Sequence, residues 1–378
     1  MTRSRLHIPS LDGIRAISIM IVFLAHAGFY DKIPGGMGVT IFFFLSGFLI
    51  TTLLRVELES TGKIDLRRFY LRRVLRIFPP FYAFLAISLL AAFLWIIPTK
   101  VSWEGVGAQV LYLYNYFGIV RGPDGIPPGT DVFWSLAVEE HFYLVFPFAY
   151  LWLHRRVASS RGRALGLAIA CAVVLAWRFV LVFAMHVPWM YTYSATDTRI
   201  DSILYGCLLA TWRNPALDPV AEGTEKRHRL WSALGTVAGL ATLLFTVVYR
   251  APWFRETLRY SIQGLALLAL FQAAVRYPDW ACFRPLNWRP MRTLGVLSYS
   301  FYLVHFLVLM VVGKYVGRSL PVLNVVGFGT SLLLAVAMHH GIEKPAARLK
   351  SLWASETTPR RRSKEHGADG TNVALPRP

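Results

Sequence analysis

The sequence contains few charged residues and few cysteines for its length. Only 16% of its 378 residues are charged, against roughly 25% in ordinary soluble domains, while 55% are hydrophobic and the mean hydropathy is +0.45. The three cysteines form neither a disulfide framework nor a metal-ligand spacing. No polar stretch is long enough to hold a soluble domain, and no internal repeat stands out. These absences argue against a soluble enzyme, a disulfide-rich secreted domain and a zinc module, and they indicate lipid as the solvent.

Ten largely apolar runs could cross a membrane, for which a helix needs about 20 residues. They are 12–30, 38–54, 78–97, 132–152, 164–186, 200–212, 230–249, 257–275, 293–313 and 321–342. The sixth run is short. The sequence therefore predicts an all-α, polytopic membrane protein of about ten transmembrane helices. Residues 1–345 form its membrane domain, and residues 346–378 form a polar tail that we expect to be disordered.

The net charge of +19 would suit a nucleic-acid-binding protein, but the distribution of the basic residues indicates membrane topology instead. Roughly 29 of the 40 lysines and arginines lie in the N-terminus, in alternate connections between the apolar runs and in the tail, as the positive-inside rule requires. The longest connection with few basic residues is 98–131. We therefore expect cytoplasmic termini, residues 98–131 outside, and no nucleic-acid partner.

Two ionisable residues in the first predicted span are candidates for chemistry, because charged groups inside spans are costly and usually face the protein interior. Arg15 and His26 are eleven residues apart, almost three helical turns, which places them on one face about 16 Å apart along the axis. Arg15 would then lie near the cytoplasmic end and His26 in the outer half. The alternatives are an arginine that reaches lipid phosphates and a histidine that only hydrogen-bonds a neighbouring helix. A cleaved signal peptide would remove both residues, and we expect none.

The fourth predicted span begins with Trp134 and continues to Glu139, Glu140 and His141. It runs inward, which places Glu139 at about the depth of His26. A carboxylate beside a neutral imidazole fixes the tautomer and stabilises the imidazolium, and this is the usual arrangement of a general base. Because neighbouring residues on a helix point in different directions, we expect only one of the two glutamates to meet His26. A structural ion pair with an arginine is the alternative.

Three arginines, Arg72, Arg73 and Arg76, stand at the cytoplasmic start of the third predicted span. Arg73 and Arg76, at i and i+3, share a helix face and form a fork suited to phosphate oxygens. Positive-inside topology alone also explains a basic loop, but three arginines packed against one span favour phosphate binding. Gly35, Gly36, Gly38 and Gly47, in and just before the second span, are expected to allow close helix packing instead of holding a ligand.

Other polar residues give weaker signals. Arg199 and Asp201 flank the outer start of the sixth span and either touch a substrate or pair with each other. His305 lies in the ninth span, where a histidine is more often a hydrogen-bonding core residue than a catalyst. His339 and His340 have no metal-ligand spacing, and we expect no metal site.

Taken together, the sequence resembles the membrane acyltransferase 3 family. Six motifs occur in the family's order and cover roughly residues 11–345. They are Leu11–Arg15 with His26, Phe43–Ile50, Arg72–Pro79, Trp134–Tyr143, Arg199–Asp201 and Ser298–His305. Each motif alone is weak, but the six in order are specific.

The resemblance implies an enzyme of the bacterial inner membrane with ten spans, which O-acylates carbohydrates, usually with acetyl from acetyl-CoA. It assigns the family's essential arginine and histidine to Arg15 and His26, and its Arg-x-x-Arg element to Arg73 and Arg76. The extracytoplasmic hydrolase-like domain that some members carry is not expected here.

The sequence and the resemblance together predict an acyltransferase that moves an acyl group, most often acetyl, onto a hydroxyl of a carbohydrate or glycolipid. His26 would be the general base, with Glu139 or Glu140 beside it. The expected acyl-CoA site consists of Arg72, Arg73, Arg76 and Arg15, and the expected acceptor site of Arg199, Asp201 and Trp134. Acyl-CoA would be a co-substrate, with no tightly bound cofactor.

The alternative is a transporter or flippase for a glycolipid or a small molecule, in which the buried charges would line a pathway. Such proteins often carry inverted repeats and pairs of spans broken by Gly or Pro in matching positions. The sequence shows neither feature, which favours the enzyme.

Overall fold

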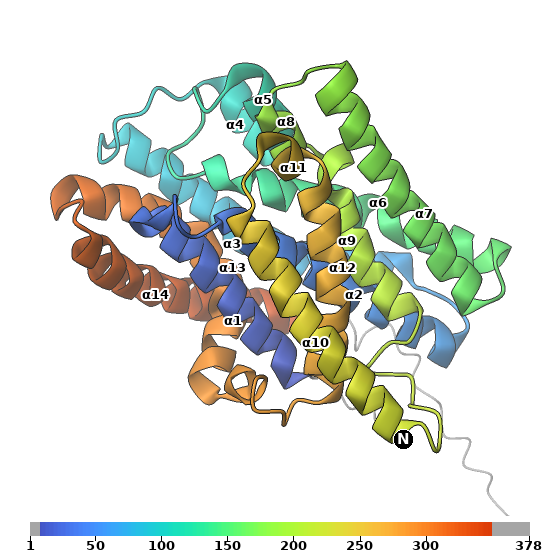
Figure 1. Cartoon of the computed structure of the whole chain (residues 1–378). Coiled ribbons are helices and arrows are strands. Elements are labelled where there is room, and N and C mark those ends of the chain that lie inside the picture. The colour runs from blue at the N-terminus through green and yellow to red at the C-terminus, as the bar shows by residue number, and fades with distance from the viewer. Residues whose placement is uncertain (1–7, 350–378) are drawn as a thin grey trace, which may run out of the picture.

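The computed structural model describes residues 8–349, and every regular element in this range is a helix (Figure 1). The long helices are α1 (Pro9–Leu24), α2 (Gly35–Thr61), α3 (Leu66–Phe93), α6 (Trp134–Arg156), α7 (Ser160–Phe179), α9 (Thr196–Thr211), α10 (Glu225–Val248), α12 (Leu258–Arg276), α13 (Arg289–Tyr315) and α14 (Gly327–Met338). The short helices are α4 (Trp103–Val110), α5 (Tyr114–Arg121), α8 (Trp189–Ser194) and α11 (Pro252–Glu256). Six single turns complete the range: η1 (Ala25–Phe29), η2 (Asp131–Phe133), η3 (Val180–Ala184), η4 (Arg284–Asn287), η5 (Val322–Val326) and η6 (His339–Glu343).

The predicted all-α membrane architecture is confirmed. Within residues 8–349, eight helical segments are long and apolar enough to cross a membrane. The predicted fourth and sixth spans correspond to α6 and α9, which are not among these eight. Charged residues lower the apolar character of both helices: α6 carries Glu139 and Glu140, and the 16-residue α9 carries Arg199 and Asp201. Ten spans stay a prediction because eight segments meet this criterion, and cytoplasmic termini stay one because residues 1–7 and 350–378 lie outside the described range. Of the tail predicted to be disordered, residues 346–349 continue the last helix, and the remainder also lies outside that range.

The long helices alternate in direction and so define two ends of the bundle. The start of α1, the start of α3 and the end of α6 lie at one end, which we call the arginine end. The turn η1 with His26, the start of α2 and the end of α3 lie at the other, which we call the histidine end. Contacts between distant segments agree with this arrangement: Arg72 pairs with Glu57 at the arginine end, and Asn324 donates to the Ala27 carbonyl at the histidine end.

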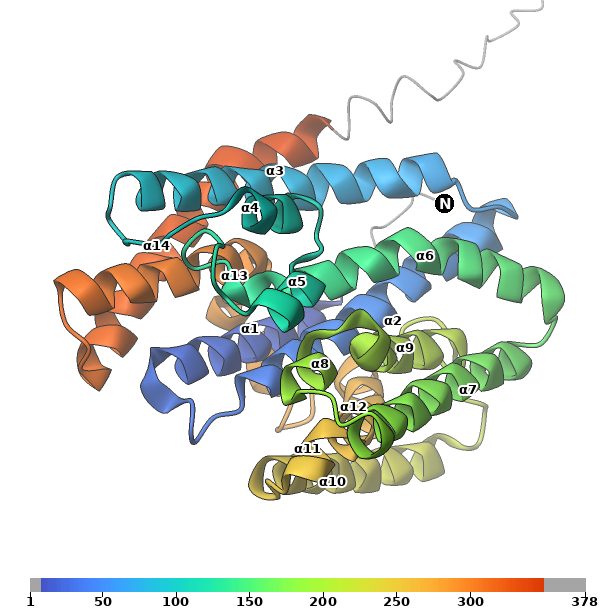
Figure 2. The ribbon, with the colours of Figure 1, turned by 90° about the horizontal axis from the view of Figure 1, so that it is seen from above.

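Three helices form the interior of the bundle. The most apolar windows of the spans that contain α1, α2 and α13 are 61%, 72% and 72% buried, against 22% for those that contain α7, α10 and α14. In Figure 2, α1 and α2 lie in the middle, with α3 along one side and α10 along the opposite side. Because lipid replaces water around a spanning helix, the exposed apolar faces of the outer helices are the surfaces that meet the membrane.

Glycines allow the interior helices to touch through their backbones. A Cβ at Gly47 of α2 would lie 1.9 Å from the Ile203 carbonyl of α9, and one at Gly38 would lie 2.6 Å from the Ser18 carbonyl of α1. Small residues serve this purpose in membrane helix pairs, where no hydrophobic effect drives association. The prediction that these glycines permit helix packing is confirmed.

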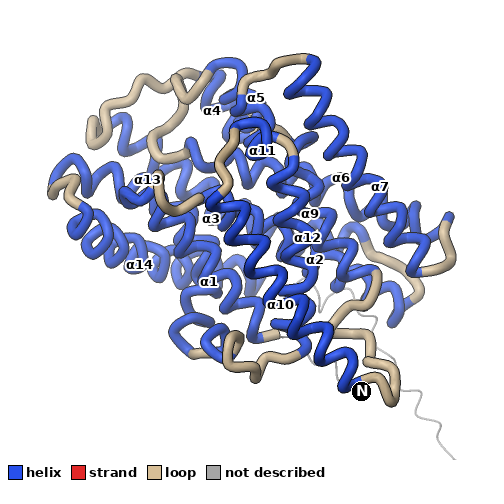
Figure 3. Tube along the Cα trace, in the orientation of Figure 1, coloured by secondary structure: helices blue, strands red, loops and turns tan. Residues whose placement is uncertain are grey.

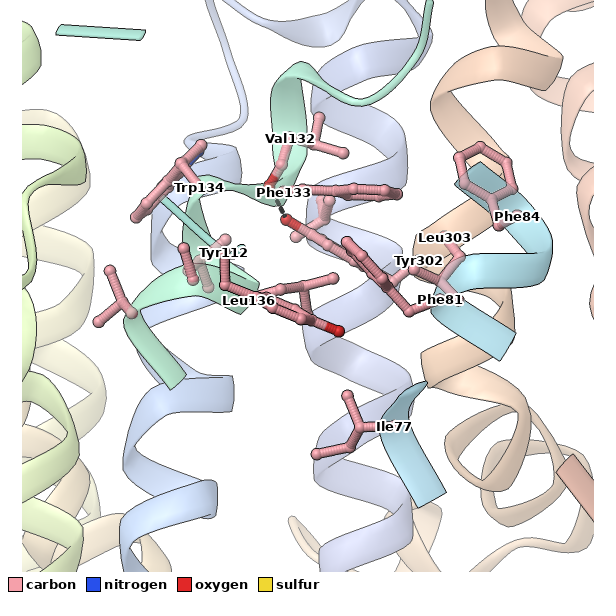
Figure 4. Close-up of a cluster of buried hydrophobic side chains, with 14 of the residues drawn as sticks. Ile77, Phe81, Phe84, Tyr112, Val132, Phe133, Trp134, Leu136, Tyr302 and Leu303 are labelled. Atoms are coloured by element: carbon pink, nitrogen blue, oxygen red, sulfur yellow. Dashed lines mark hydrogen bonds between the residues drawn. The ribbon is translucent and has the colours of Figure 1, made fainter. Parts of the chain in front are cut away.

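The connection between α3 and α6 covers the histidine end with the short helices α4 and α5 and with loops (Figure 3). Two of its aromatic side chains, Tyr112 and Tyr114, are buried, whereas Trp103 is exposed. Tyr112 is buried, and its ring centroid lies 4.4 Å from that of Phe81, while Phe81 also contacts Phe133 (Figure 4). This packing fixes the start of α6, and therefore the height of Glu139 and Glu140 in the bundle.

Candidate active site

An inner cavity of about 100 Å³ lies between α1, α2, α3, α6 and α13. Its charged lining residues are Arg15 from α1, Arg73 and Arg76 from α3, and Glu139 and Glu140 from α6. The remaining wall is mainly aromatic and aliphatic. The structure therefore brings together residues that the sequence places in three separate spans.

Glu139 is held in this cavity by hydroxyl groups. The Ser46 hydroxyl donates to one carboxylate oxygen at 3.0 Å, and the Tyr143 hydroxyl lies 3.1 Å from the other oxygen. The Tyr143 hydroxyl also lies 3.1 Å from Ser46, so the three groups form one cluster. The guanidinium of Arg73 stands 5.1 Å from the centre of the Tyr143 ring. This environment stabilises a buried carboxylate without a direct salt bridge.

Three charged side chains of the cavity keep their hydrogen-bonding groups free. Within residues 8–349, the side chains of Arg73, Arg76 and Glu140 form neither a hydrogen bond nor a salt bridge. Arg73 instead rests on the rings of Tyr143 and Phe69. A guanidinium that is positioned by aromatic rings and has unused N–H donors is suited to bind the anionic group of a ligand.

A second cavity adjoins the first at the arginine end, and we call it the basic mouth. Its charged lining residues are Arg15, Arg72, Arg76, His339, Glu343 and Lys344. Arg15 and Arg76 line both cavities and therefore lie where the two adjoin. Arg15 bonds Asp12 at 2.9 Å and Arg72 bonds Glu57 at 3.1 Å, whereas Glu343 binds Ser300 and His339. This junction is therefore positively charged, and within residues 8–349 the Arg76 side chain forms neither a hydrogen bond nor a salt bridge.

His26 lies at the histidine end in the turn η1, where the chain leaves the helical conformation at Ala27 and at Gly28, whose φ is 106°. Its Nδ1 atom is 3.0 Å from Nε2 of His305 on α13, and the ring centroids are 5.2 Å apart. His305 is fully buried, and its Nδ1 lies 2.7 Å from the Tyr302 carbonyl. The two histidines thus form a hydrogen-bonded pair that is anchored to the backbone.

The anchor determines which nitrogen of each ring carries the proton. A carbonyl can only accept, so Nδ1 of His305 donates to Tyr302, and Nε2 of a neutral His305 is left as an acceptor. Nδ1 of His26 must then donate to it, which leaves a lone pair on Nε2 of His26. That atom has no hydrogen-bond partner among the described residues. The pair therefore presents the lone pair that a general base requires.

The partner of His26 differs from the one that the sequence led us to expect. Neither Glu139 nor Glu140 forms a hydrogen bond with His26 in the described part of the chain. The reason lies in the packing: α1 lies against α13, which carries His305, while α6 faces α2, which carries Ser46. A carboxylate partner would fix the tautomer of His26 and would also stabilise the imidazolium by its negative charge. His305 does the first but carries no negative charge.

Tyr302 connects the histidine pair with the inner cavity. It lines the cavity, its carbonyl anchors His305, and its hydroxyl lies 2.7 Å from Ser135 and bonds the Val132 carbonyl. Figure 4 shows its side chain reaching toward Val132, beside Phe133. His26 does not line the inner cavity itself, so Tyr302 stands at the boundary between the charged residues and the histidines.

Arg199 is fully buried in a cage of aromatic rings. Its guanidinium lies 3.9 Å from the ring centre of Tyr260, 5.3 Å from that of Trp134 and 5.4 Å from that of Phe43. It donates to the Tyr193 carbonyl and forms no salt bridge among the residues that the structure describes. A buried cation is costly unless its surroundings compensate it, and here aromatic faces supply that compensation.

Asp201 pairs with a different arginine from the neighbour that the sequence suggested. Its carboxylate receives two hydrogen bonds from Arg178 of α7, at 2.9 and 2.7 Å, and one from Ser261 of α12. Arg178 and Asp201 are both fully buried. This salt bridge joins α7, α9 and α12, which is a structural role, and it leaves Arg199 and Trp134 as the two acceptor-site candidates that lie together.

The sequence did not single out several residues that complete the site. Ser46, Tyr143 and Tyr302 occur inside the motifs but carry no charge, so their roles depend on which helices meet. Arg178 lies near the outer end of the fifth predicted span, where any intramembrane arginine is a candidate for a buried pair. That signal was available from the sequence.

Comparison with known proteins places these features in context. A family model described as an acyltransferase domain matches residues 8–340. Peptidoglycan O-acetyltransferase OatA from Listeria monocytogenes is 29% identical over 314 residues, which cover 80% of this chain and 49% of the relative. O-acetyltransferase OatA from Staphylococcus aureus is 30% identical over 374 residues, which cover 94% of this chain and 60% of the relative.

A putative peptidoglycan O-acetyltransferase, YrhL from Bacillus subtilis, is 28% identical over 363 residues, which cover 91% of this chain and 55% of the relative. The chain thus spans about half to three fifths of the length of these curated relatives. No solved structure matches it.

Proposed function

Since the chain belongs to the acyltransferase domain family, we propose that it transfers an acetyl group from acetyl-CoA to a hydroxyl group of a carbohydrate in a bacterial inner membrane. The printed names of its relatives describe O-acetyltransferases, two of them peptidoglycan O-acetyltransferases, one putatively so. Membership in this family favours the enzyme over a transporter or flippase, which was the alternative that the buried charges left open.

The basic mouth is the proposed entrance for acetyl-CoA. Arg76 has no partner within residues 8–349, and Arg15 and Arg72 stand beside it, so the phosphates of the donor would meet guanidinium groups with free donors. Arg73 continues the basic path into the inner cavity. The aromatic and aliphatic wall beyond it suits the acyl-bearing arm, which is largely uncharged.

His26 is the proposed general base. As the acceptor hydroxyl attacks the thioester carbonyl, its proton passes to Nε2 of His26, and a C–O bond forms. The C–S bond then breaks, and the CoA sulfur leaves with the proton that the imidazolium returns. His305 keeps Nδ1 of His26 protonated throughout and so keeps Nε2 available. An acyl-histidine intermediate on His26 would use the same lone pair.

The observation that carries the proposal is the division of the site between two ends. Arg73 and Arg76, which have no hydrogen-bond or salt-bridge partner within residues 8–349, line the cavities at the arginine end, and a histidine with an available lone pair lies at the other end. Along α1, Arg15 and His26 are separated by about 16 Å, a span that suits a long donor with phosphates at one end and a thioester at the other.

Acetyl transfer by purified protein tests the proposal. The protein in lipid nanodiscs is incubated with radiolabelled acetyl-CoA and isolated peptidoglycan or soluble oligosaccharides, and both free CoA and labelled carbohydrate are measured. We expect the two products in equal amounts. Binding of acetyl-CoA without labelled carbohydrate from any acceptor would contradict the proposed reaction.

Orientation in the membrane is tested separately by cysteine labelling. Cys171 and Cys207 are buried and Cys282 is exposed, so Cys282 is first replaced by serine. We then expect a membrane-impermeant maleimide to label Trp103→Cys in intact spheroplasts, and to label Thr224→Cys only after the cells are opened. Labelling of Thr224→Cys in intact spheroplasts would refute the orientation.

A further inference from the structure

A cleft at the histidine end combines arginines with aromatic rings, and we call it the arginine cleft. It has two adjoining lobes of about 170 and 290 Å³. Tyr30, Tyr193, Arg255, Arg259 and Tyr260 line both lobes. These residues come from the loop after η1, from α8, and from the consecutive helices α11 and α12, so the cleft is built by three regions that are distant in the sequence.

The arginines of this cleft have unused hydrogen-bond donors. Neither Arg255 nor Arg259 forms a salt bridge in the described part of the chain, and the side chain of Arg255 forms no hydrogen bond there. Arg259 donates to the Tyr260 hydroxyl at 2.9 Å, but its buried Nε atom has no partner. Arg250 lines the first lobe as well, and the carboxylates of the cleft are Asp31 in the first lobe and Glu256 in the second, so its three arginines outnumber its two acidic residues. The positive-inside rule makes basic residues scarce on this side, so their concentration around one cleft needs another reason.

The cleft shares a chain segment with His26, although His26 lines neither lobe, and the aromatic cage around Arg199 separates the cleft from the inner cavity. Tyr30 directly follows the turn η1, which holds His26. Tyr193 and Tyr260 line the cleft and belong to the cage, while Phe43 belongs to the cage and lines the inner cavity. One wall is thus shared by the cleft and the donor side.

We propose that the arginine cleft binds the acceptor through an anionic group, either a carboxylate or a phosphate, carried by a sugar. This inference rests on the proposed function. Arginine forks recognise carboxylate and phosphate groups with two parallel hydrogen bonds. Aromatic side chains offer flat apolar faces with polar tips, which suit the C–H faces and hydroxyl groups of a sugar ring. The acceptor hydroxyl would then reach His26 from the side opposite to acetyl-CoA.

Binding of three matched sugars tests this assignment without any acetyl transfer. The probes are chitobiose, chitobiose 1-phosphate and the disaccharide of N-acetylglucosamine and N-acetylmuramic acid, which differ only in the anionic group. Dissociation constants are measured by isothermal titration calorimetry for the full chain in phosphatidylcholine nanodiscs. The variants are Arg255→Gln and Arg259→Gln, and the control is Arg318→Gln, an exposed arginine at the same end and outside the cleft.

We expect at least one of the two anionic sugars to bind wild type about tenfold or more tightly than chitobiose, and each cleft variant to lose that preference. The control should keep it, and all variants should keep the wild-type thermal midpoint. Whether the phosphate or the carboxylate sugar gains more identifies the anion. Equal binding of the three sugars, no binding of any, or an unchanged preference in both cleft variants would overturn the proposal.

Two further measurements distinguish sugar binding in the cleft from lipid binding there, and distinguish failure of the cleft proposal from failure of the proposed function. If nanodiscs of phosphatidylglycerol abolish sugar binding while those of phosphatidylcholine do not, a lipid headgroup occupies the cleft and the assignment to a sugar is wrong. If the anionic sugars bind as expected but never receive acetyl, the proposed function fails and the binding site stands. If chitobiose is acetylated as readily as the anionic sugars, only the cleft proposal fails.

Discussion

Replacing His305 with leucine removes the acceptor that fixes the tautomer of His26, while leaving an apolar side chain in a fully buried position. Replacing it with glutamine keeps an amide oxygen that can accept from Nδ1 of His26. The two variants therefore separate the hydrogen bond from the packing. Because the arginines lie at the opposite end of the bundle, neither change should alter acetyl-CoA binding.

The size of the effect follows from one hydrogen bond. In His305→Leu, the active tautomer of His26 carries a buried N–H without a partner, which costs about 1–3 kcal/mol. If the ring instead adopts the other tautomer, Nε2 is protonated and cannot act as a base. Since each 1.4 kcal/mol corresponds to a factor of ten, kcat should fall by about 5- to 150-fold. His305→Gln should stay within about fivefold of wild type.

Steady-state acetyl transfer in nanodiscs measures both quantities, with KM for acetyl-CoA as the internal reference. His228→Leu is the control, because His228 also lies in a helix long and apolar enough to span a membrane, bonds Tyr277 and Gln272, and lines none of the cavities described above. We expect the control to retain the wild-type kcat. Wild-type turnover by His305→Leu, or an equal loss in His305→Gln, would refute the positioning role.

Three further predictions concern the donor site, the carboxylates and the packing. Arg76→Ala should raise Kd for acetyl-CoA by about tenfold or more, because the guanidinium of Arg76 is free to bind phosphate, and Arg76→Lys should restore only part of the affinity. If the alanine variant binds acetyl-CoA like wild type in a calorimetric titration, the arginines serve membrane topology alone. Glu139→Gln should destabilise the protein by about 1.5–3 kcal/mol, because the Glu139 carboxylate accepts hydrogen bonds from two hydroxyl groups. Glu140→Gln should leave stability unchanged, and equal thermal midpoints of the two variants would contradict this prediction. Gly47→Ala should destabilise the protein by about 1–3 kcal/mol or more, because the added Cβ would meet a backbone carbonyl. The control Gly329→Ala adds a Cβ that would meet nothing within 4 Å, so its stability in the same thermal assay should be equal to or slightly above that of wild type.

The membrane fold was predictable because lipid imposes simple requirements. Apolar length identifies spans and basic residues identify connections, and both signals can be read without knowing which helices touch. The same reasoning placed Arg73, Arg76 and Arg15 together, because charged groups avoid lipid and the starts of α1 and α3 lie at the same end. The sixth predicted run is short, and the helix it corresponds to, α9, buries Arg199 and Asp201 among its apolar residues, which lowers its apolar character further.

The partners of individual side chains were not predictable, because they depend on which helices face one another. A carboxylate was the chemically reasonable partner for His26, but α13 packs against α1 and supplies His305 instead. Likewise, Asp201 had a nearby arginine in the sequence, yet Arg178 reaches it from another helix. Depth along a helix can be counted from residue numbers, whereas the identity of the facing helix cannot.

The central claim, that His26 is the base and acetyl-CoA is held elsewhere, is tested most directly by His26→Ala. Acetyl transfer and acetyl-CoA binding are measured on the same nanodisc preparation, by labelled product and by calorimetry. We predict that transfer falls on the order of 10²–10⁴-fold, while Kd for acetyl-CoA stays within about threefold of wild type because the arginines of the basic mouth are untouched. Turnover within a few-fold of wild type, or loss of acetyl-CoA binding together with activity, would contradict the account.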